Sequence, residues 1–214
     1  MKGIPEENQS PKTTWTTKLF TMPNKNKKRC PWPSDIPIMI MYHDKEWGVP
    51  VHNDRKLFEF LLLEGFQAGL SWLTILNKRK NFKNAFDNFD FNKVSGYDKR
   101  KINSLLKDEG IIRNKLKIES AVTNAKAFLK VRKEFGTFDK YIWSFVNGEP
   151  IINKYKSLKR VPARTKLSDK ISVELKKRGF RFVGSTIIYA HMQATGMVND
   201  HTTDCFRYKE LLKK

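Results

Sequence analysis

The sequence has little cysteine, little acidic charge and no long apolar run. Two cysteines in 214 residues exclude the disulfide-rich frameworks of small secreted proteins. The apolar stretches, such as residues 58–63, are far shorter than the roughly 18 to 20 residues of a membrane span. No apolar core follows the first basic residue, so no secretory signal is expected. We therefore expect a cytoplasmic protein with reduced thiols and no membrane partner.

The charge balance is strongly basic. There are 42 Lys and Arg residues against 22 Asp and Glu, which gives a net charge of +20. Such an excess favours a polyanionic partner, and nucleic acid is the first candidate. Residues 1–29 are predicted to form a flexible basic arm, and residues 207–214 a basic tail. Residues 30–206 are predicted to form one domain, in which the densest basic region, residues 153–181, holds eleven basic and two acidic residues.

Helical periodicity dominates the domain, and alternating strand patterns are scarce. The first core helix is expected from Asp54, as its N-cap, to about Glu64, with Gly65 and Gly69 breaking the helical pattern beyond it. A second helix should be capped by Ser71. Further helices are predicted over residues 98–107, 114–133, 138–145, 168–178 and 185–195, and four glycines with positive φ are expected to end helices, at Gly110, Gly136, Gly179 and Gly196. The fold class is therefore all-α.

Four residues near the two ends of the domain have the composition of a zinc site, namely Cys30, His43, His201 and Cys205. If the residues between His201 and Cys205 are helical, both side chains leave the same face and can share one ion. Such an ion would join the N- and C-terminal regions. Two buried thiols and two ordinary histidines are an equally good interpretation of the spacing alone.

Two further segments suggest contacts with DNA. Residues 105–118 predict a helix, a turn at Gly110 and a second helix capped by Asn114, which is a helix-hairpin-helix pattern. Its backbone N–H groups, with Arg113, Lys115 and Lys117, would bind a phosphate; a plain helical hairpin with solvated lysines is the alternative. Leu70, between Gly69 and Ser71, is an apolar wedge for the base stack.

Glu64 follows an apolar run beside aromatic residues, where a carboxylate would accept hydrogen bonds from a base edge. A carboxylate that faces water at a helix end is the alternative. Four aromatic side chains are candidates for a stacking pocket, Tyr42, Trp32, Trp47 and Trp72, although buried tryptophans are more often plain core.

Several ordered motifs resemble the 3-methyladenine DNA glycosylase I family, a branch of the helix-hairpin-helix glycosylases. The resemblance covers about residues 30–206 and rests on RCPW, MYHDKEWGVP, LLLEGFQAGLSW, GIIRNKLKI, WSFVNG, KKRGFRFVGSTIIYAHMQATGMVNDH and Cys205. It implies an all-α fold with one structural Zn²⁺, held at the positions of Cys30, His43, His201 and Cys205. It also implies that Glu64 recognises the damaged base, with Tyr42, Trp72 and Trp32 in the pocket.

The resemblance further implies repair of alkylated double-stranded DNA by a monomer associated with a bacterial nucleoid. The damaged nucleotide would be flipped out and 3-methyladenine released by hydrolysis, leaving an abasic site without strand cleavage. The chain departs from the family at Met39, where the family carries a tyrosine. A DNA-binding module without activity and a zinc-stapled interaction protein are the rival interpretations.

Overall fold

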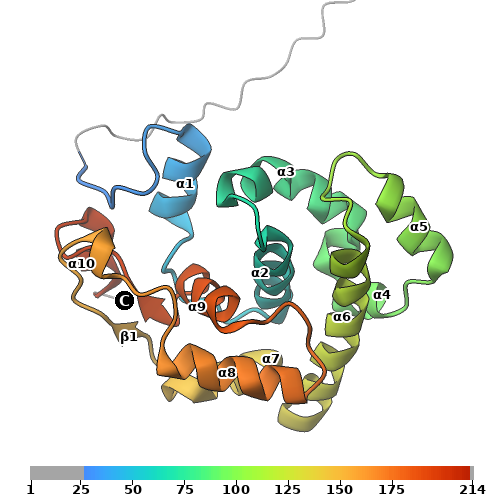
Figure 1. Cartoon of the computed structure of the whole chain (residues 1–214). Helices are drawn as coiled ribbons and strands as arrows, with labels where there is room; N and C mark the ends of the chain where they lie inside the picture. Colours follow the sequence, from blue (N-terminus) through green and yellow to red (C-terminus); the bar gives the residue numbers. More distant parts are fainter. Residues whose placement is uncertain (1–26, 213–214) are drawn as a thin grey trace, which may run out of the picture.

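The computed structural model describes residues 27–212. The predicted arm therefore lies almost wholly outside the described residues. Helices make up most of the described chain (Figure 1). The α-helices are α1 (Pro37–Lys45), α2 (Asp54–Gln67), α3 (Trp72–Ala85), α4 (Phe91–Ser95), α5 (Lys99–Lys107), α6 (Lys115–Phe135), α7 (Phe138–Trp143), α8 (Lys166–Lys177), α9 (Ser185–Ala194) and α10 (Phe206–Leu211).

Three short 3₁₀ turns and two short strands complete the described chain. The turns are η1 (Asp87–Phe89), η2 (Ser144–Val146) and η3 (Leu158–Arg160). The strands β1 (Ile151–Ile152) and β2 (Val198–Asn199) pair in parallel. The all-helical prediction is thus confirmed apart from this one small ladder. Within residues 27–212, no helix is both long and apolar enough to cross a membrane.

Helix α2 runs through the core and packs against α3, α6, α7 and α9 (Figure 1). Its leucine and phenylalanine side chains are almost fully buried, and all of them except Phe60 lie in one cluster with Phe128 of α6 and Phe138 of α7. In this cluster the rings of Phe128 and Phe138 stack at 4.2 Å. The central position of α2 fixes the residues of its last turn, which include Glu64.

The helix boundaries correct several predictions. The N-cap of α2 is Asn53, whose side chain accepts from the N–H of Lys56, and not Asp54. Gly65 does not break α2 but lies buried inside it, and the helix runs on to Gln67. Helix α8 begins at Lys166, two residues before its predicted start, because Thr165 and Ser168 form a capping box. The predicted caps Ser71 and Asn114 are confirmed, and Asp98, predicted as the first residue of its helix, is instead the N-cap of α5.

Positive φ occurs at three of the four predicted glycines but not at Gly110. Gly196 has a φ of +72°, and a Cβ there would lie 2.4 Å from backbone atoms of Val49 and Pro50. Only glycine allows this close approach of α9 to the α1–α2 connection. The approach is reinforced by the N–H of Gly48, which donates to the carbonyl of Gln193 at 2.9 Å. It brings α1 and α9 to one site.

Candidate functional site

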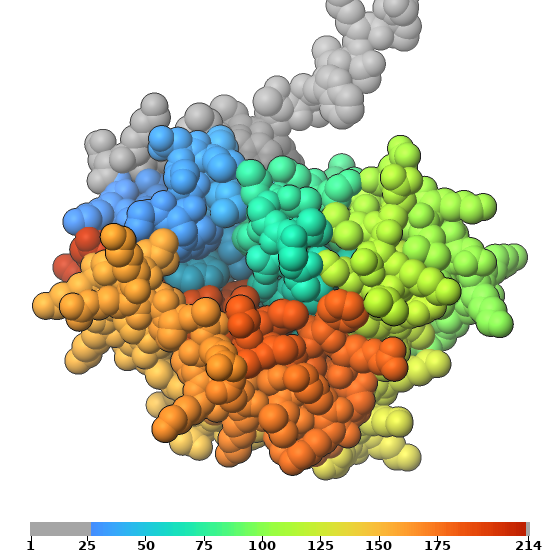
Figure 2. All heavy atoms as spheres, viewed as in Figure 1, coloured from blue at the N-terminus to red at the C-terminus, as the bar shows by residue number. Residues whose placement is uncertain are grey.

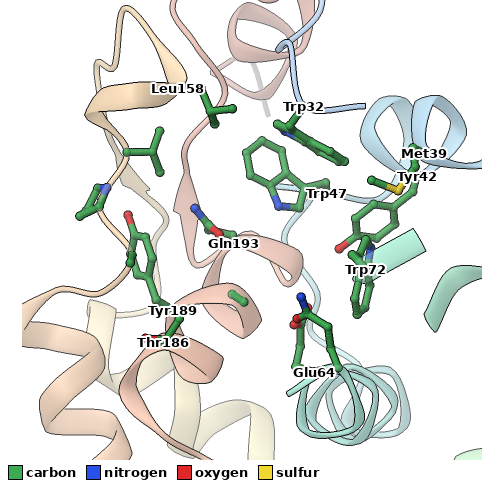
Figure 3. A pocket seen from close by; sticks show the side chains of 15 residues that line it. Trp32, Met39, Tyr42, Trp47, Glu64, Trp72, Leu158, Thr186, Tyr189 and Gln193 are labelled. Atoms are coloured by element: carbon green, nitrogen blue, oxygen red, sulfur yellow. The ribbon is translucent and has the colours of Figure 1, made fainter. Parts of the chain in front are cut away.

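A pocket of about 440 Å³ opens between α1, α2, α9 and the connection from β1 to α8 (Figure 3). This volume lies in the range of small-molecule pockets in proteins and is large enough for a nucleic-acid base. Its lining is mostly aromatic and apolar, with one acidic side chain: Trp32, Met39, Tyr42, Trp47, Glu64, Gln67, Trp72, Leu158, Val161, Pro162, Ala163, Thr186, Tyr189, Ala190 and Gln193.

Glu64 lies at the base of this pocket (Figure 3). It is 3% exposed, so the alternative of a water-facing carboxylate is wrong. Burial raises the pKa of Glu64 from its ordinary value near 4.5 to about 8. No opposing cation contributes to this shift, since desolvation is its sole cause. A positively charged ligand in the pocket would therefore gain directly from ionised Glu64.

Tyr42, Trp72 and Trp32 form one wall of the pocket. The rings of Tyr42 and Trp72 are 5.3 Å apart, and those of Trp32 and Tyr42 are 6.2 Å apart. The indole nitrogens of Trp32 and Trp72 are buried without a hydrogen-bond partner among the described residues. Unpaired buried donors are costly, so these two nitrogens lower the stability of this wall in the absence of a partner. Met39 also lines the wall, so the departure from the family pattern lies in the pocket itself.

The opposite wall was not predicted. On α9, four residues that line the pocket follow the spacing of one helix face, namely Thr186, Tyr189, Ala190 and Gln193. Two signals in the sequence point to them: this spacing, and their place in the motif of residues 176–201. The rest of this wall comes from residues 158–163, which pack across from Trp32 (Figure 3).

Cys30, His43, His201 and Cys205 meet in a buried cluster. Their ligand atoms all lie within 4.8 Å of one another. The Sγ of Cys205 is 3.5 Å from His43 Nε2 and 3.5 Å from His201 Nδ1. Residues 203 and 204 form a turn, so the helical geometry predicted for this segment is wrong, although the two side chains still converge. The hydrogen bond between the two thiols, together with the nearby histidines, holds the pKa of Cys205 well below its usual range.

The partners of the two histidines suit a metal ion. His43 Nδ1 bonds to Asp44 at 2.8 Å, and Asp44 is clamped by Arg29. His201 Nε2 bonds to the carbonyl of Trp47 at 3.0 Å. Both acceptors require N–H on these nitrogens, which leaves the other ring nitrogen of each histidine free to face the two sulfurs. Two thiolates and two neutral imidazoles are the donor set of a closed zinc site.

The predicted hairpin consists of the end of α5, a turn and the start of α6. The N–H of Gly110 is donated to Asp108 Oδ1 at 2.8 Å, so it does not point outward as expected. The N–H groups of Ile112 and Arg113 have no hydrogen bond within the part of the chain that is described. The side chains of Arg113 and Lys115 are exposed.

Leu70 lies in the loop between α2 and α3 and is 39% exposed. The loop is fixed by the buried Lys117 of α6, whose Nζ donates to the carbonyls of Phe66 at 2.8 Å and Ala68 at 2.6 Å. Lys117 thus connects the hairpin to the loop that carries Leu70. The expectation that Lys117 contributes charge for a phosphate is wrong, because its side chain is buried and its ammonium group donates to these two carbonyls.

The fold and the site together define a class of helical proteins in which an aromatic pocket with a buried acid lies beside a Cys₂His₂ cluster. The family model of methyladenine glycosylase matches residues 32–208. The chain belongs to the methyladenine glycosylase family, which confirms the resemblance found in the sequence.

Two curated relatives are similar over nearly their whole length. DNA-3-methyladenine glycosylase 1 of Escherichia coli K12 is 46% identical over 181 residues, which are 85% of this chain and 97% of that protein. DNA-3-methyladenine glycosylase of Haemophilus influenzae is 48% identical over 177 residues, 83% of this chain and 96% of that protein.

Solved structures agree with these relatives. A crystal structure of 3-methyladenine DNA glycosylase I superimposes with a TM-score of 0.82 at 47% identity, over 84% of this chain and 98% of that one. The Staphylococcus aureus enzyme, studied for its recognition of 3-methyladenine, gives a TM-score of 0.81 at 33% identity, over 83% of this chain and 95% of that one.

Proposed function

We propose that this protein is a DNA glycosylase that hydrolyses the N-glycosidic bond of 3-methyladenine in alkylated duplex DNA. The observation that carries the proposal is the buried carboxyl of Glu64 in an aromatic pocket of about 440 Å³. The names of the relatives, DNA-3-methyladenine glycosylases at 46% and 48% identity, support the same substrate.

The damaged base carries its own positive charge while it is attached to the sugar, because N3-methylation makes adenine cationic. The aromatic faces of Tyr42, Trp72 and Trp32 would attract this cation, at roughly 0.5 to 2 kcal/mol for each good contact. Ionised Glu64 adds charge complementarity and accepts hydrogen bonds from the base edge. Normal adenine is neutral and gains neither term, which is the basis of selectivity.

The reaction needs little acid catalysis. The cationic base leaves as a neutral molecule, its electrons coming from the glycosidic bond, and water attacks the sugar to give an abasic site. No lysine is among the residues described as lining the pocket, which supports simple hydrolysis over an imine mechanism with strand cleavage. We therefore expect a monofunctional enzyme.

Access to the base requires that the nucleotide be flipped out of the duplex, at a cost of a few kcal/mol. We assign Leu70 as the wedge that fills the vacated stack, which its exposure on a loop held by Lys117 supports. The helix-hairpin-helix segment would bind the DNA backbone through Arg113 and Lys115, but not through the N–H of Gly110, which donates to Asp108. The N–H groups of Ile112 and Arg113, which have no partner among residues 27–212, add donors for a phosphate.

We also infer that Cys30, His43, His201 and Cys205 hold one structural Zn²⁺. The ion would supply four bonds that tie residues 30–43 to residues 201–205, and four protein ligands leave no position for a catalytic water. Its contribution is to folding, so chelation is expected to lower the melting temperature and helicity. Loss of excision with both unchanged would contradict a structural role.

The test is chromatography of the bases released from N-methylated duplex DNA. We expect free 3-methyladenine from the wild-type protein and intact strands until the abasic sites are cleaved by alkali. Glu64→Gln should release the base at least tenfold more slowly, whereas Glu149→Gln, at an exposed position, should match the wild type. DNA binding without any base release from a folded, zinc-loaded sample would instead support the rival DNA-binding module.

A further inference from the structure

The connection between β1 and α8 is the most basic segment of the described chain that the proposed function does not use. Residues 153–166, here called the basic rim, contain six cations and no acidic residue: Lys154, Lys156, Lys159, Arg160, Arg164 and Lys166. All six are exposed. A charge density of this kind must be explained either by solvation alone or by an anionic partner.

The basic rim forms part of the pocket wall. Leu158, Val161, Pro162 and Ala163 line the pocket, and Leu158 lies across from Trp32 (Figure 3). Consequently the cations at positions 156, 159 and 160 are within two residues of a side chain that lines the pocket. In the space-filling view, this orange segment borders a hollow whose other border is formed by the blue and teal residues (Figure 2).

The cations of the basic rim are poorly neutralised by the protein. Arg164 is 3.8 Å from Asp169, and the other five form no ion pair with any residue between 27 and 212. Many other basic side chains of the molecule do have carboxylate partners, as with Arg79, which is paired with both Glu46 and Glu59. The basic rim therefore presents positive charge that an external anion can use.

The backbone of the basic rim is anchored at both ends. Asn153 donates to the buried Asp200 at 2.6 Å, and the carbonyl of Tyr155 accepts from the N–H of Thr203 at 2.9 Å. At the other end, Thr165 and Ser168 form the capping box of α8. Because both ends are anchored, the backbone that carries these cations loses less conformational freedom when an anion binds, which lowers the entropic cost of binding.

We propose that the basic rim binds the phosphodiester backbone of duplex DNA next to the nucleotide whose base enters the pocket. This inference rests on the proposed function, because a base reaches the pocket only if its sugar and flanking phosphates lie at the mouth. The hairpin and Leu70 belong to other segments, so the basic rim is a second, separate backbone contact. It holds the flipped strand on the side of the pocket opposite the aromatic wall.

The test is the salt dependence of duplex binding, measured by fluorescence anisotropy with an oligonucleotide that carries an abasic-site analogue. Each phosphate contact contributes about 0.9 to the slope of log K against log salt. The triple variant Lys156→Gln, Lys159→Gln, Arg160→Gln should therefore lower the slope by about 2 to 3. The corresponding loss of affinity is at most about 500-fold at 0.1 M salt.

A matched variant removes the same charge elsewhere. Lys126, Lys130 and Lys133 are exposed on α6, which lies across the molecule from β1 and α10 (Figure 1). Their replacement by Gln should change the slope by less than about 1. An equal decrease of the slope in both variants would overturn the proposal, because the total charge of the protein would then explain the binding. An unchanged slope in the rim variant would overturn it as well.

Binding of free 3-methyladenine, followed by tryptophan fluorescence, separates this inference from the proposed function. The rim variant should bind the free base as the wild type does. If it fails to fold, the single variants Lys156→Gln and Lys159→Gln serve instead, each with a slope change of about 1. The two proposals can also fail separately. If the wild-type protein released no base, the proposed glycosylase function would be refuted. If the rim variant still lowered the salt slope of DNA binding and the α6 variant did not, the proposed backbone contact would stand.

Discussion

Glu64→Gln should stabilise the protein at alkaline pH while it lowers activity. Burial raises the pKa of Glu64 from near 4.5 to about 8. The unfolded chain loses this proton above pH 4.5, whereas the folded chain keeps it up to about pH 8. The folded state thus binds more protons across this window, so the free energy of unfolding falls as pH rises. The free energy of unfolding changes by 1.36 kcal/mol for each pH unit between the two pKa values, so ionisation of Glu64 lowers it by at most about 5 kcal/mol.

Gln has the shape of the protonated acid and does not titrate, so the variant avoids this loss. Its advantage over the wild type should be below about 1 kcal/mol at pH 5 and reach about 2 to 5 kcal/mol at pH 8. That corresponds to a rise in melting temperature of roughly 5 to 15 °C for a domain of this size. Urea unfolding at pH 5, 6.5 and 8 measures the difference directly. A metal that is lost at low pH affects both proteins equally and cancels.

Two results would refute this reasoning. A variant no more stable than the wild type at pH 8 would mean that Glu64 is hydrated in the folded state. A stability difference of the same size at pH 5 and pH 8 would mean that packing, and not ionisation, is its cause. Excision adds a second check, since kcat/KM of the wild type should rise with pH up to about 8 and the variant should lack this rise.

The remaining predictions concern three other side chains. Leu70→Ala should slow single-turnover excision from duplex DNA and leave excision from single strands unchanged; an unchanged duplex rate would remove Leu70 as the wedge. Lys117→Met deletes hydrogen bonds to two buried carbonyls and should lower the free energy of unfolding by about 2 to 4 kcal/mol in urea titrations. His191 is buried, and desolvation lowers its pKa to about 4. The unfolded chain therefore binds this proton more readily, so the free energy of unfolding falls by up to about 3 kcal/mol as pH falls from 6.5 towards 4. Titration of its ring protons by NMR should give a midpoint near pH 4, and a midpoint near 6.5 would show that the ring is solvated.

Sequence periodicity predicted the helices that have one buried face. Helix α1 was not predicted because its sequence, PIMIMYHDK, is apolar almost all round. The structure explains this composition, since Met39 and Tyr42 line the pocket while His43 belongs to the buried Cys₂His₂ cluster. These three residues share one helix face, and Ile38, Ile40 and Met41 occupy much of the rest, so the helix has no polar stripe in its first two turns. The short helices α4 and α10 were missed because five or six residues give too few turns for a pattern.

The near side of the pocket could be predicted from the sequence, whereas on the far side only the α9 residues lie in a motif that resembles the family and residues 158–163 do not. Glu64, Tyr42, Trp72 and Trp32 all belong to motifs that resemble the family, and the structure brings them together. Residues 158–163 lie about a hundred positions further along the chain, and only tertiary packing places them against the same cavity. The high positive charge of this region was evident in the sequence, but no local sequence pattern indicated that the region lies beside the pocket.

The cluster and the pocket are parts of one structural unit. Tyr42 precedes the ligand His43, Trp32 follows Cys30 by two residues, and the carbonyl of Trp47 bonds to His201. An ion that fixes the cluster therefore also fixes the aromatic wall that must surround a buried acid. Chelation should accordingly weaken the binding of free 3-methyladenine and lower the melting temperature together, in the same chelator titration. Loss of base binding at an unchanged melting temperature would mean that the ion acts on the pocket directly.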